Sequence, residues 1–274
     1  MCGYCGCSTD AKVDGHAHTH AHDHAHDHAH GEHRHEHAHG VHDHAHHDHG
    51  DDKTLELSRM VLGENQRLAE RVRGILLAKG ITAINVVSSP GSGKTTLLQE
   101  SLRRLQAEGL RPAVLVGDLA TDNDAARLRD SGAPAVQITT GNVCHLDAHM
   151  VLHGFEQIDL NAIDVLFLEN VGNLVCPAAF DLGEDHRVVL TSTTEGEDKP
   201  LKYPTIFDGA DLALITKMDL AEVLEVDLPA LHAAIADVAP GAPVLELSTR
   251  SDDGLEPWLD FVRRSVEAKR AVAL

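Results

Sequence analysis

The sequence predicts an α/β protein with a mostly parallel central sheet flanked by helices, in the architecture of a P-loop nucleotide-binding domain, preceded by a disordered tail. Short continuous apolar segments alternate with helical stretches, which is typical of parallel strands covered on both faces. One apolar segment leads directly into the glycine-rich sequence SSPGSGKTT. Of the 22 histidines, 17 lie between His16 and His49, so the start of the chain differs in kind from the rest.

Three segments are expected along the 274 residues. Residues 1–10 hold three cysteines and no apolar pattern, and they form an N-terminal cysteine motif. Residues 11–52 alternate histidine with alanine, glycine and acidic residues, and such a segment cannot bury an apolar core, so we expect a disordered linker. Residues 53–274 have ordinary hydrophobic patterning and are expected to form one domain.

The elements of this domain follow its apolar pattern. Apolar residues at helical spacing predict a helix over 55–79, ended by Gly80, and a second helix follows the glycine-rich loop through Leu105. A last helix contains Trp258. Continuous apolar runs predict six strands, at 84–87, 113–116, 165–168, 188–190, 212–215 and 244–247.

Charge and composition exclude several classes of protein. The formal net charge is −20; residues 1–52 hold ten acidic and two basic side chains, a net −8, which leaves −12 for the rest. Neither part is a basic nucleic-acid-binding surface. No apolar run approaches the ~18–20 residues of a membrane span, and no signal peptide opens the chain, so we expect a cytoplasmic protein with reduced cysteines.

The glycine-rich loop carries the strongest catalytic signal. Its backbone N–H groups, ahead of a helix N-terminus, are expected to bind phosphate groups, while Lys94 reaches the β- and γ-phosphates and the Thr95 hydroxyl binds Mg²⁺. The usual pattern GxxxxGK[ST] begins with glycine, whereas Ser88 stands there in this chain. The residues predicted to bind nucleotide at this loop are Gly91, Ser92, Gly93, Lys94, Thr95 and Thr96.

Acidic residues end two of the predicted strands. Asp118 and Glu169 each follow an apolar run, and carboxylates at this position commonly hold Mg²⁺ directly or through water. We therefore predict catalytic roles for both, beside Lys94 and Thr95. Asp122 and Asp124 lie in the following loop and are further candidates, with a helix N-cap as the alternative for any one of them.

A second motif indicates which base is bound. Thr216-Lys217-Met218-Asp219 follows a predicted strand and resembles the NKxD motif of GTPases. The Asp219 carboxylate would accept two hydrogen bonds from guanine that adenine cannot supply, and Lys217 would lie along the base. Thr216 replaces the usual asparagine, which removes the contacts of its amide. Ser248, after the last strand, is a weaker candidate for a guanine-contacting loop. We interpret the nucleotide as GTP.

Thiols and imidazoles inside the domain suggest a metal site. Cys144 and His145 are adjacent, His149 follows four residues later, and a helix that began near His145 would place both histidines on one face. Cys176 lies after the strand that carries Glu169. Such donors suit Zn²⁺ or Ni²⁺. The alternative, that both cysteines are small buried hydrophobes, is equally compatible with the spacing.

The segment 169–176 joins a predicted nucleotide ligand to a predicted metal ligand. Loss of the γ-phosphate would therefore be able to move the metal site through this connector, and metal affinity is expected to differ between the GTP and GDP states.

The N-terminal segments offer further donors. Cys2, Cys5 and Cys7 supply three thiolates, and a terminal amine or backbone amide nitrogen would complete the square-planar set that Ni²⁺ accepts. The alternatives are incidental thiols or a zinc site. The histidine tract offers many equivalent imidazoles, which we interpret as weak to moderate nickel sites useful for storage.

Together these motifs resemble the hydrogenase nickel incorporation (HypB) family over nearly the whole chain. The sequences that carry the resemblance are the N-terminal cysteine cluster, the histidine-rich linker, SPGSGKTT, GDLATDNDAARL, CHLDA, ENVGNLVCP, EGEDKPLKYP and TKMDL. The resemblance implies a GTPase of the signal-recognition and MinD-like (SIMIBI) class, with slow turnover and a nucleotide-dependent homodimer. It also implies help in inserting Ni²⁺ into the large subunit of [NiFe]-hydrogenase, together with the nickel chaperone HypA.

The resemblance also assigns metal ligands. Cys2, Cys5 and Cys7 match the tight N-terminal nickel site of the family. A second site, for Zn²⁺ or Ni²⁺ at the dimer interface, is matched by Cys144, His145, His149 and Cys176.

Two alternatives remain at this stage. The first is the urease accessory GTPase, which also delivers nickel, but its metal motif is Cys-Pro-His and it lacks the N-terminal cysteine cluster. The second is a nickel-storage protein whose nucleotide site is a relic. Hydrolysis that depends on Lys94 would exclude the second alternative.

Overall fold

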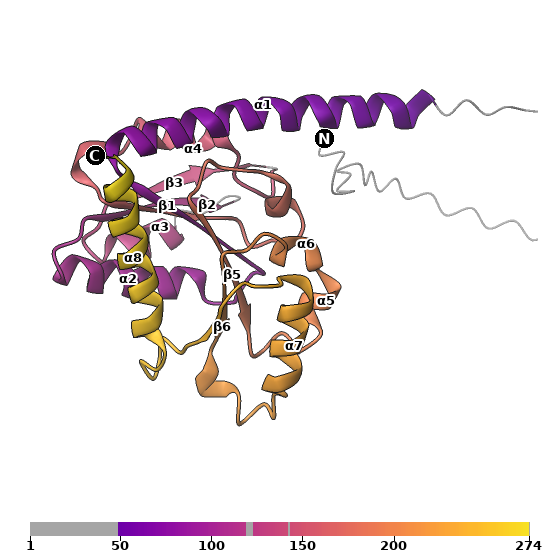
Figure 1. Ribbon diagram of the computed structural model, residues 1–274, viewed down its shortest axis with the longest axis vertical. Helices are drawn as coiled ribbons and strands as arrows, with labels where there is room; N and C mark the ends of the chain where they lie inside the picture. The colour runs from indigo at the N-terminus through magenta and orange to yellow at the C-terminus, as the bar shows by residue number, and fades with distance from the viewer. Residues whose placement is uncertain (1–48, 119–122, 142, 274) are drawn as a thin grey trace, which may run out of the picture. The chain divides into compact units, whose positions relative to one another are not determined.

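The computed structural model describes residues 49–118, 123–141 and 143–273, and the chain divides into two units, residues 1–57 and 58–274. The second unit contains the sheet and the helices that cover it (Figure 1). The helices are α1 (His49–Lys79), α2 (Lys94–Ala107), α3 (Asn123–Arg129), α4 (Ala148–Phe155), α5 (Lys199–Lys202), α6 (Pro204–Phe207), α7 (Leu228–Val238) and α8 (Leu255–Ala273). The strands are β1 (Thr82–Ser88), β2 (Pro112–Asp118), β3 (Ala135–Thr139), β4 (Val165–Glu169), β5 (His186–Ser192), β6 (Leu212–Thr216) and β7 (Val244–Glu246).

The described strands form one parallel sheet in the order β3-β2-β4-β1-β5-β6-β7. This confirms the predicted α/β fold with a parallel central sheet, and each of the six predicted strands is present. The structure adds β3, an edge strand that the apolar pattern did not reveal, since Gln137 interrupts it and its residues are mostly half-buried. The first helix begins at His49, ahead of the domain boundary predicted at residue 53.

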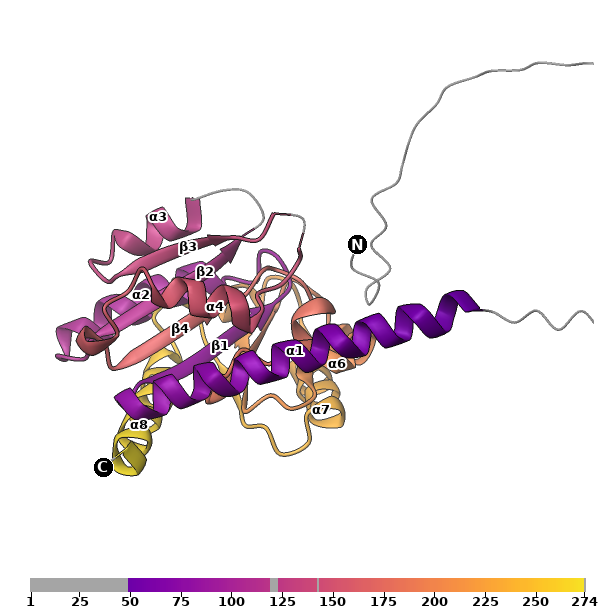
Figure 2. The same ribbon diagram turned by 90° about the horizontal axis from the view of Figure 1, so that it is seen from above.

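Helices cover both faces of the sheet (Figures 1 and 2). On one face α2, α3 and α8 pack over the strands and bury the tryptophan of α8, Trp258. On the other face α1 and α4 cover one half of the sheet, and α6 and α7 cover the other half. Burial on both faces explains why the central strands read as continuous apolar runs rather than as alternating ones.

The carboxyl ends of the parallel strands meet at one edge of the sheet and bring distant segments together. Ser88 ends β1, Asp118 ends β2 and Glu169 ends β4, and these three strands are neighbours, with β4 in the centre. Ligands of open α/β sheets bind at this edge. The fold therefore places the predicted phosphate loop and both predicted strand-end carboxylates side by side.

Several predictions fall outside the described residues. They concern Cys2, Cys5 and Cys7, the histidine tract and Asp122. Among the helices in the described part of the chain, none is both long and apolar enough to cross a membrane.

Candidate functional site

The phosphate loop runs from β1 to α2 with the backbone that its glycines allow. Gly91 has φ 75° and Gly93 has φ 102°, values that favour glycine. Ser88, at the first position of the motif, is buried, and its hydroxyl accepts hydrogen bonds from the Ser92 hydroxyl and from Lys94. Serine therefore supplies a polar contact inside the loop, where the usual motif has glycine.

Lys94 lies at the centre of this loop and is only 7% exposed. Its Nζ donates to the Ser88 hydroxyl at 2.6 Å and to the Ser89 carbonyl at 3.4 Å. Burial lowers the pKa of the Lys94 amino group, and the nearby carboxylates of Glu169 and Glu195 act in the opposite direction. The side chain is thus fixed beside the loop, in place for the phosphate groups of a nucleotide.

Thr95 and Glu169 form the second polar contact of the site. The Thr95 hydroxyl donates to Oε1 of Glu169 at 2.6 Å, and burial raises the pKa of Glu169 to about 7. The other carboxylate oxygen, Oε2, is buried without a hydrogen-bond partner in the described structure. Hydroxyl and carboxylate oxygens are the ligands that Mg²⁺ prefers, so Thr95, Glu169 and the neighbouring Asp118 fit this ion and would hold it.

A cavity of about 500 Å³ opens between these groups. It joins the phosphate loop to the ends of β2, β4 and β6. The lining residues include Gly91, Gly93, Lys94, Thr95, Thr96, Asp118, Asp124, Arg127, Glu169 and Lys217. Most of the residues predicted from the sequence to bind nucleotide and Mg²⁺ therefore lie around one space.

The predicted base-binding residues lie together after β6 and β7. The Ser248 hydroxyl donates to Oδ1 of Asp219 at 2.6 Å and accepts hydrogen bonds from the backbone N–H groups of Arg250 and Ser251. Lys217 has a left-handed backbone, with φ 58°, and its side chain lines the cavity. Ser248 therefore contacts the carboxylate that we expect to bind guanine, and this orients that carboxylate.

The contacts of three polar side chains at the site were not predicted from the sequence. Glu195 accepts a hydrogen bond from Ser89 of the phosphate loop, and Thr216 donates to the carbonyl of Ser92 in the same loop at 2.7 Å. Asn170 contacts the segment that carries Cys144 and His145. The signal that identified Asp118 and Glu169, an acidic residue at the end of a strand, does not extend to Glu195, which lies in the turn that follows β5.

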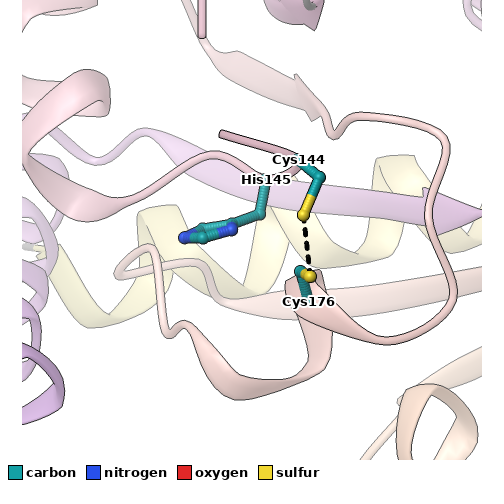
Figure 3. Close-up of side chains that lie close together, drawn as sticks. All are labelled: Cys144, His145 and Cys176. Atoms are coloured by element: carbon teal, nitrogen blue, oxygen red, sulfur yellow. Dashed lines mark hydrogen bonds between the residues drawn. The ribbon is translucent and has the colours of Figure 1, made fainter. Parts of the chain in front are cut away.

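Cys144, His145 and Cys176 form a thiol–imidazole cluster (Figure 3). One ligand atom from each lies within 4.8 Å of the others, and the two sulfur atoms are 2.7 Å apart. Cys176 begins the 3₁₀ turn Cys176–Ala179, and Oδ1 of Asn173 accepts the N–H groups of Val175 and Cys176. Two segments 32 positions apart are thus brought to one point, as the metal prediction requires.

The donor set of this cluster fits a borderline metal ion. The His145 ring stacks on Phe180 at a centroid distance of 3.8 Å, and burial lowers the pKa of the imidazole, which favours the neutral form that binds metals. Its Nδ1 is buried and has no hydrogen-bond partner among the described residues. With two thiols beside it, this nitrogen suits Zn²⁺ or Ni²⁺, and the three side chains would hold such an ion.

His149 lies apart from the three clustered residues. Helix α4 begins at Ala148, because Asp147 caps it by accepting the N–H of Met150 at 2.7 Å. His145 precedes the helix, so the expectation that one helical face carries both histidines is wrong. His149 is exposed and its ring lies edge-on against that of His153, with centroids 4.7 Å apart.

Asn170 connects the cluster to the nucleotide cavity. It follows Glu169 directly, and its Oδ1 accepts the N–H groups of Leu146 and Val171, each at 3.0 Å. Two residues further, Gly172 packs so closely on the phosphate loop that a Cβ there would lie 2.9 Å from the Cα of Pro90. The connector between the two sites therefore touches both of them.

The fold and the cavity define the class of the molecule as a P-loop nucleotide-binding protein with a parallel sheet. The family model described as "CobW/HypB/UreG, nucleotide-binding domain" matches residues 82–246. The chain is 50% identical over 213 residues to hydrogenase maturation factor HypB of Azotobacter vinelandii. This match covers 77% of this chain and 70% of the relative. The chain therefore belongs to the HypB family of hydrogenase maturation factors.

Two solved structures of this family share the fold. HypB from Archaeoglobus fulgidus is 41% identical with a TM-score of 0.70, and the match covers 74% of this chain and 99% of that one. HypB from Helicobacter pylori, solved in complex with nickel, is 38% identical with a TM-score of 0.72, over 76% of this chain and 97% of that one. Both matches extend over the described domain and confirm its α/β fold.

Proposed function

We propose that the protein is a GTP-hydrolysing nickel metallochaperone that assists insertion of Ni²⁺ into the large subunit of [NiFe]-hydrogenase. The observation that carries the proposal is the physical link between its two sites: Glu169 lies in the nucleotide cavity, and the next residue, Asn170, holds the segment with Cys144 and His145. A thiol–imidazole cluster joined in this way to a phosphate loop is suited to release or accept a metal ion when GTP is converted to GDP.

In the proposed reaction, GTP and water give GDP and phosphate. Lys94 would stabilise the negative charge that develops on the β- and γ-phosphates, and Thr95, Asp118 and Glu169 would hold the Mg²⁺ that supplies further positive charge there. Asp219 would select guanine, with its carboxylate oriented by Ser248. The family and its nucleotide-binding domain support this assignment.

Nickel is the proposed cargo. In this proposal, Cys144, His145 and Cys176 bind Ni²⁺ or Zn²⁺, with His149 as a further ligand. The three N-terminal cysteines form a tight nickel site, and the histidine tract stores additional ions. The proposed partners are the nickel chaperone HypA, the hydrogenase large subunit and, when nucleotide is bound, a second copy of this chain. The nickel complex of the Helicobacter pylori relative supports the choice of metal.

One titration tests the proposal. Ni²⁺ and Zn²⁺ are added separately to the full-length protein loaded with GDP or with a non-hydrolysable GTP analogue, while light scattering follows the oligomeric state. We expect the affinity of the cluster to differ between the two nucleotide states and the GTP-analogue state to dimerise. Equal metal affinities in both states would contradict the proposed delivery mechanism.

A second role, nickel storage, is favoured by the 17 histidines between His16 and His49. Deletion of residues 16–49 is expected to lower the number of nickel ions bound per chain and to leave GTP turnover intact. Acidification is expected to release the stored ions, because only the neutral imidazole binds metal. A collapse of turnover in the deletion variant would contradict a storage role.

A further inference from the structure

Thr216 stands where the guanine-binding motif usually has asparagine, yet its contact lies on the phosphate side of the cavity. Thr216 is 3% exposed, and its hydroxyl donates to the carbonyl of Ser92, inside the phosphate loop, at 2.7 Å. A weaker contact of 3.4 Å reaches the Thr191 carbonyl on β5. The end of β6 is thereby joined to the loop that precedes α2.

Glu195 makes a second contact with the same loop from the turn that follows β5. Its Oε2 accepts a hydrogen bond from the Ser89 hydroxyl, while its Oε1 accepts the N–H of Ser192 at 3.0 Å. Lys199 approaches the carboxylate to 3.7 Å and balances its charge. The carboxylate is therefore fixed from both sides and presents one oxygen to the loop.

The position of these contacts matters because the loop contains two glycines in left-handed conformations, Gly91 and Gly93. Glycine has more backbone freedom than other residues, and that freedom is lost when a ligand orders the loop. Contacts that already hold the loop in one shape lower the entropy lost at binding. Ser89 and Ser92, the two residues held from outside, lie on either side of Gly91.

We propose that Thr216 and Glu195 are positioning residues that hold the phosphate loop in its nucleotide-binding shape. This inference rests on the proposed nucleotide site. Thr216 then replaces the usual asparagine through a contact to the loop rather than to the base. The effect of losing its hydroxyl should depend on the phosphates of the nucleotide and not on guanine.

The first experiment measures GDP and GMP binding to the full-length protein by calorimetry. Thr216→Val removes the hydroxyl and is expected to weaken GDP binding about fivefold, the usual size of one hydrogen bond, and to change GMP binding less than twofold. Thr216→Ser keeps the hydroxyl and is expected to bind GDP like the wild type. Thr191→Val is the matched control, because the Thr191 hydroxyl is also buried and has no hydrogen-bond partner in the described structure.

The outcomes separate the hypotheses. Equal losses for GDP and GMP in Thr216→Val, or no loss for either, would overturn the role of Thr216. The same loss in Thr191→Val would show a general effect of strand packing and would overturn it as well. If the wild type binds neither GDP nor GTP, the proposed function itself fails. If the wild type binds nucleotide and the variants bind it equally well, only the inference about the positioning residues fails.

Glu195 is tested by a double-mutant cycle with Ser89. Glu195→Ala and Ser89→Ala each remove one partner of the hydrogen bond, and each is expected to weaken GDP binding severalfold. If both act through this bond, the double variant loses no more affinity than the weaker-binding single variant. Losses that multiply would show independent effects and would overturn the proposed role of Glu195.

Discussion

The nucleotide cavity and the thiol–imidazole cluster are held in shape in different ways. In the cavity the functional side chains bind one another: Lys94 contacts Ser88, and Thr95 contacts Glu169. In the cluster the sulfur atoms of Cys144 and Cys176 meet, but the Nδ1 of His145 is buried without a partner in the described residues. The supporting hydrogen bonds come from the neighbouring asparagines instead.

This difference indicates how each site responds to its ligand. The cavity is built from one contiguous motif and three strand ends, so its geometry is largely formed by the fold. A buried nitrogen without a partner costs free energy, which a bound metal ion would offset. We therefore expect metal to stabilise the cluster and its surroundings more than nucleotide stabilises the phosphate loop, and the predictions below test the two regions against each other.

The largest effect is expected at Lys94. Lys94→Ala should lower GTP hydrolysis at least about 100-fold, because it removes the positive charge beside the phosphate groups, and should leave Zn²⁺ binding at the cluster intact in the nucleotide-free protein. Single-turnover phosphate release and a zinc titration measure both effects. Lys202→Ala, which removes an exposed lysine, is the control. Retained hydrolysis in Lys94→Ala would remove the catalytic assignment.

The converse change tests the cluster. Cys176→Ala should weaken metal binding at the cluster about 100-fold, because it removes one of the donor atoms. Even the loss of a side chain that only hydrogen-bonds to a metal ligand lowers metal affinity about 10–100-fold. GDP affinity should remain that of the wild type. The titration uses the full-length chain with Cys2, Cys5 and Cys7 changed to serine, so that thiolate-to-nickel absorption reports the cluster. Unchanged absorption would show that Cys176 is no ligand.

Glu169, in the nucleotide cavity, makes the free energy of unfolding of the protein depend on pH. Burial raises its pKa from 4.5 to about 7, so the folded protein binds this proton more tightly than the unfolded chain does. The stabilisation is complete below pH 4.5 and is lost as the pH rises through 7, by about 3 kcal/mol. Glu169→Gln should abolish that loss, so its free energy of unfolding relative to wild type should increase over this range in nucleotide-free protein.

Urea unfolding at several pH values measures this difference. Glu222→Gln, an exposed glutamate, serves as the control. A constant difference between Glu169→Gln and wild type across this pH range would contradict the raised pKa of the buried Glu169 carboxyl group.

The smallest expected effect concerns the coupling between the two regions. Asn170→Ala removes the acceptor for the N–H groups of Leu146 and Val171, and should reduce the ratio of nickel affinities in the GTP-analogue and GDP states from about fivefold to near one. Asn161→Ala, ahead of β4 at the opposite edge of the sheet, should keep the wild-type ratio. An unchanged ratio in Asn170→Ala would place the coupling elsewhere.

Patterns that are local in sequence predicted most of the fold. The strand β1, the glycine-rich loop and α2 follow one another without interruption, so spacing was sufficient to place Lys94 and Thr95. The edge strand β3 was missed because its half-buried residues lack a continuous apolar run. A helix that began near His145 would have placed both histidines on one face, but the capping side chain of Asp147 fixes the helix start at Ala148.

The sequence by itself determined the fold class, the phosphate loop, the strand-end carboxylates and the candidate donors Cys144, His145 and Cys176. Each of these depends on residue type and short spacing, which the chain carries directly. Only the tertiary structure decided that Thr216 and Glu195 reach the phosphate loop and that Asn170 joins the two sites. Those contacts join segments at the carboxyl ends of β1, β3, β4, β5 and β6, which are distant in the chain, and the order of the strands in the folded sheet brings these segments together.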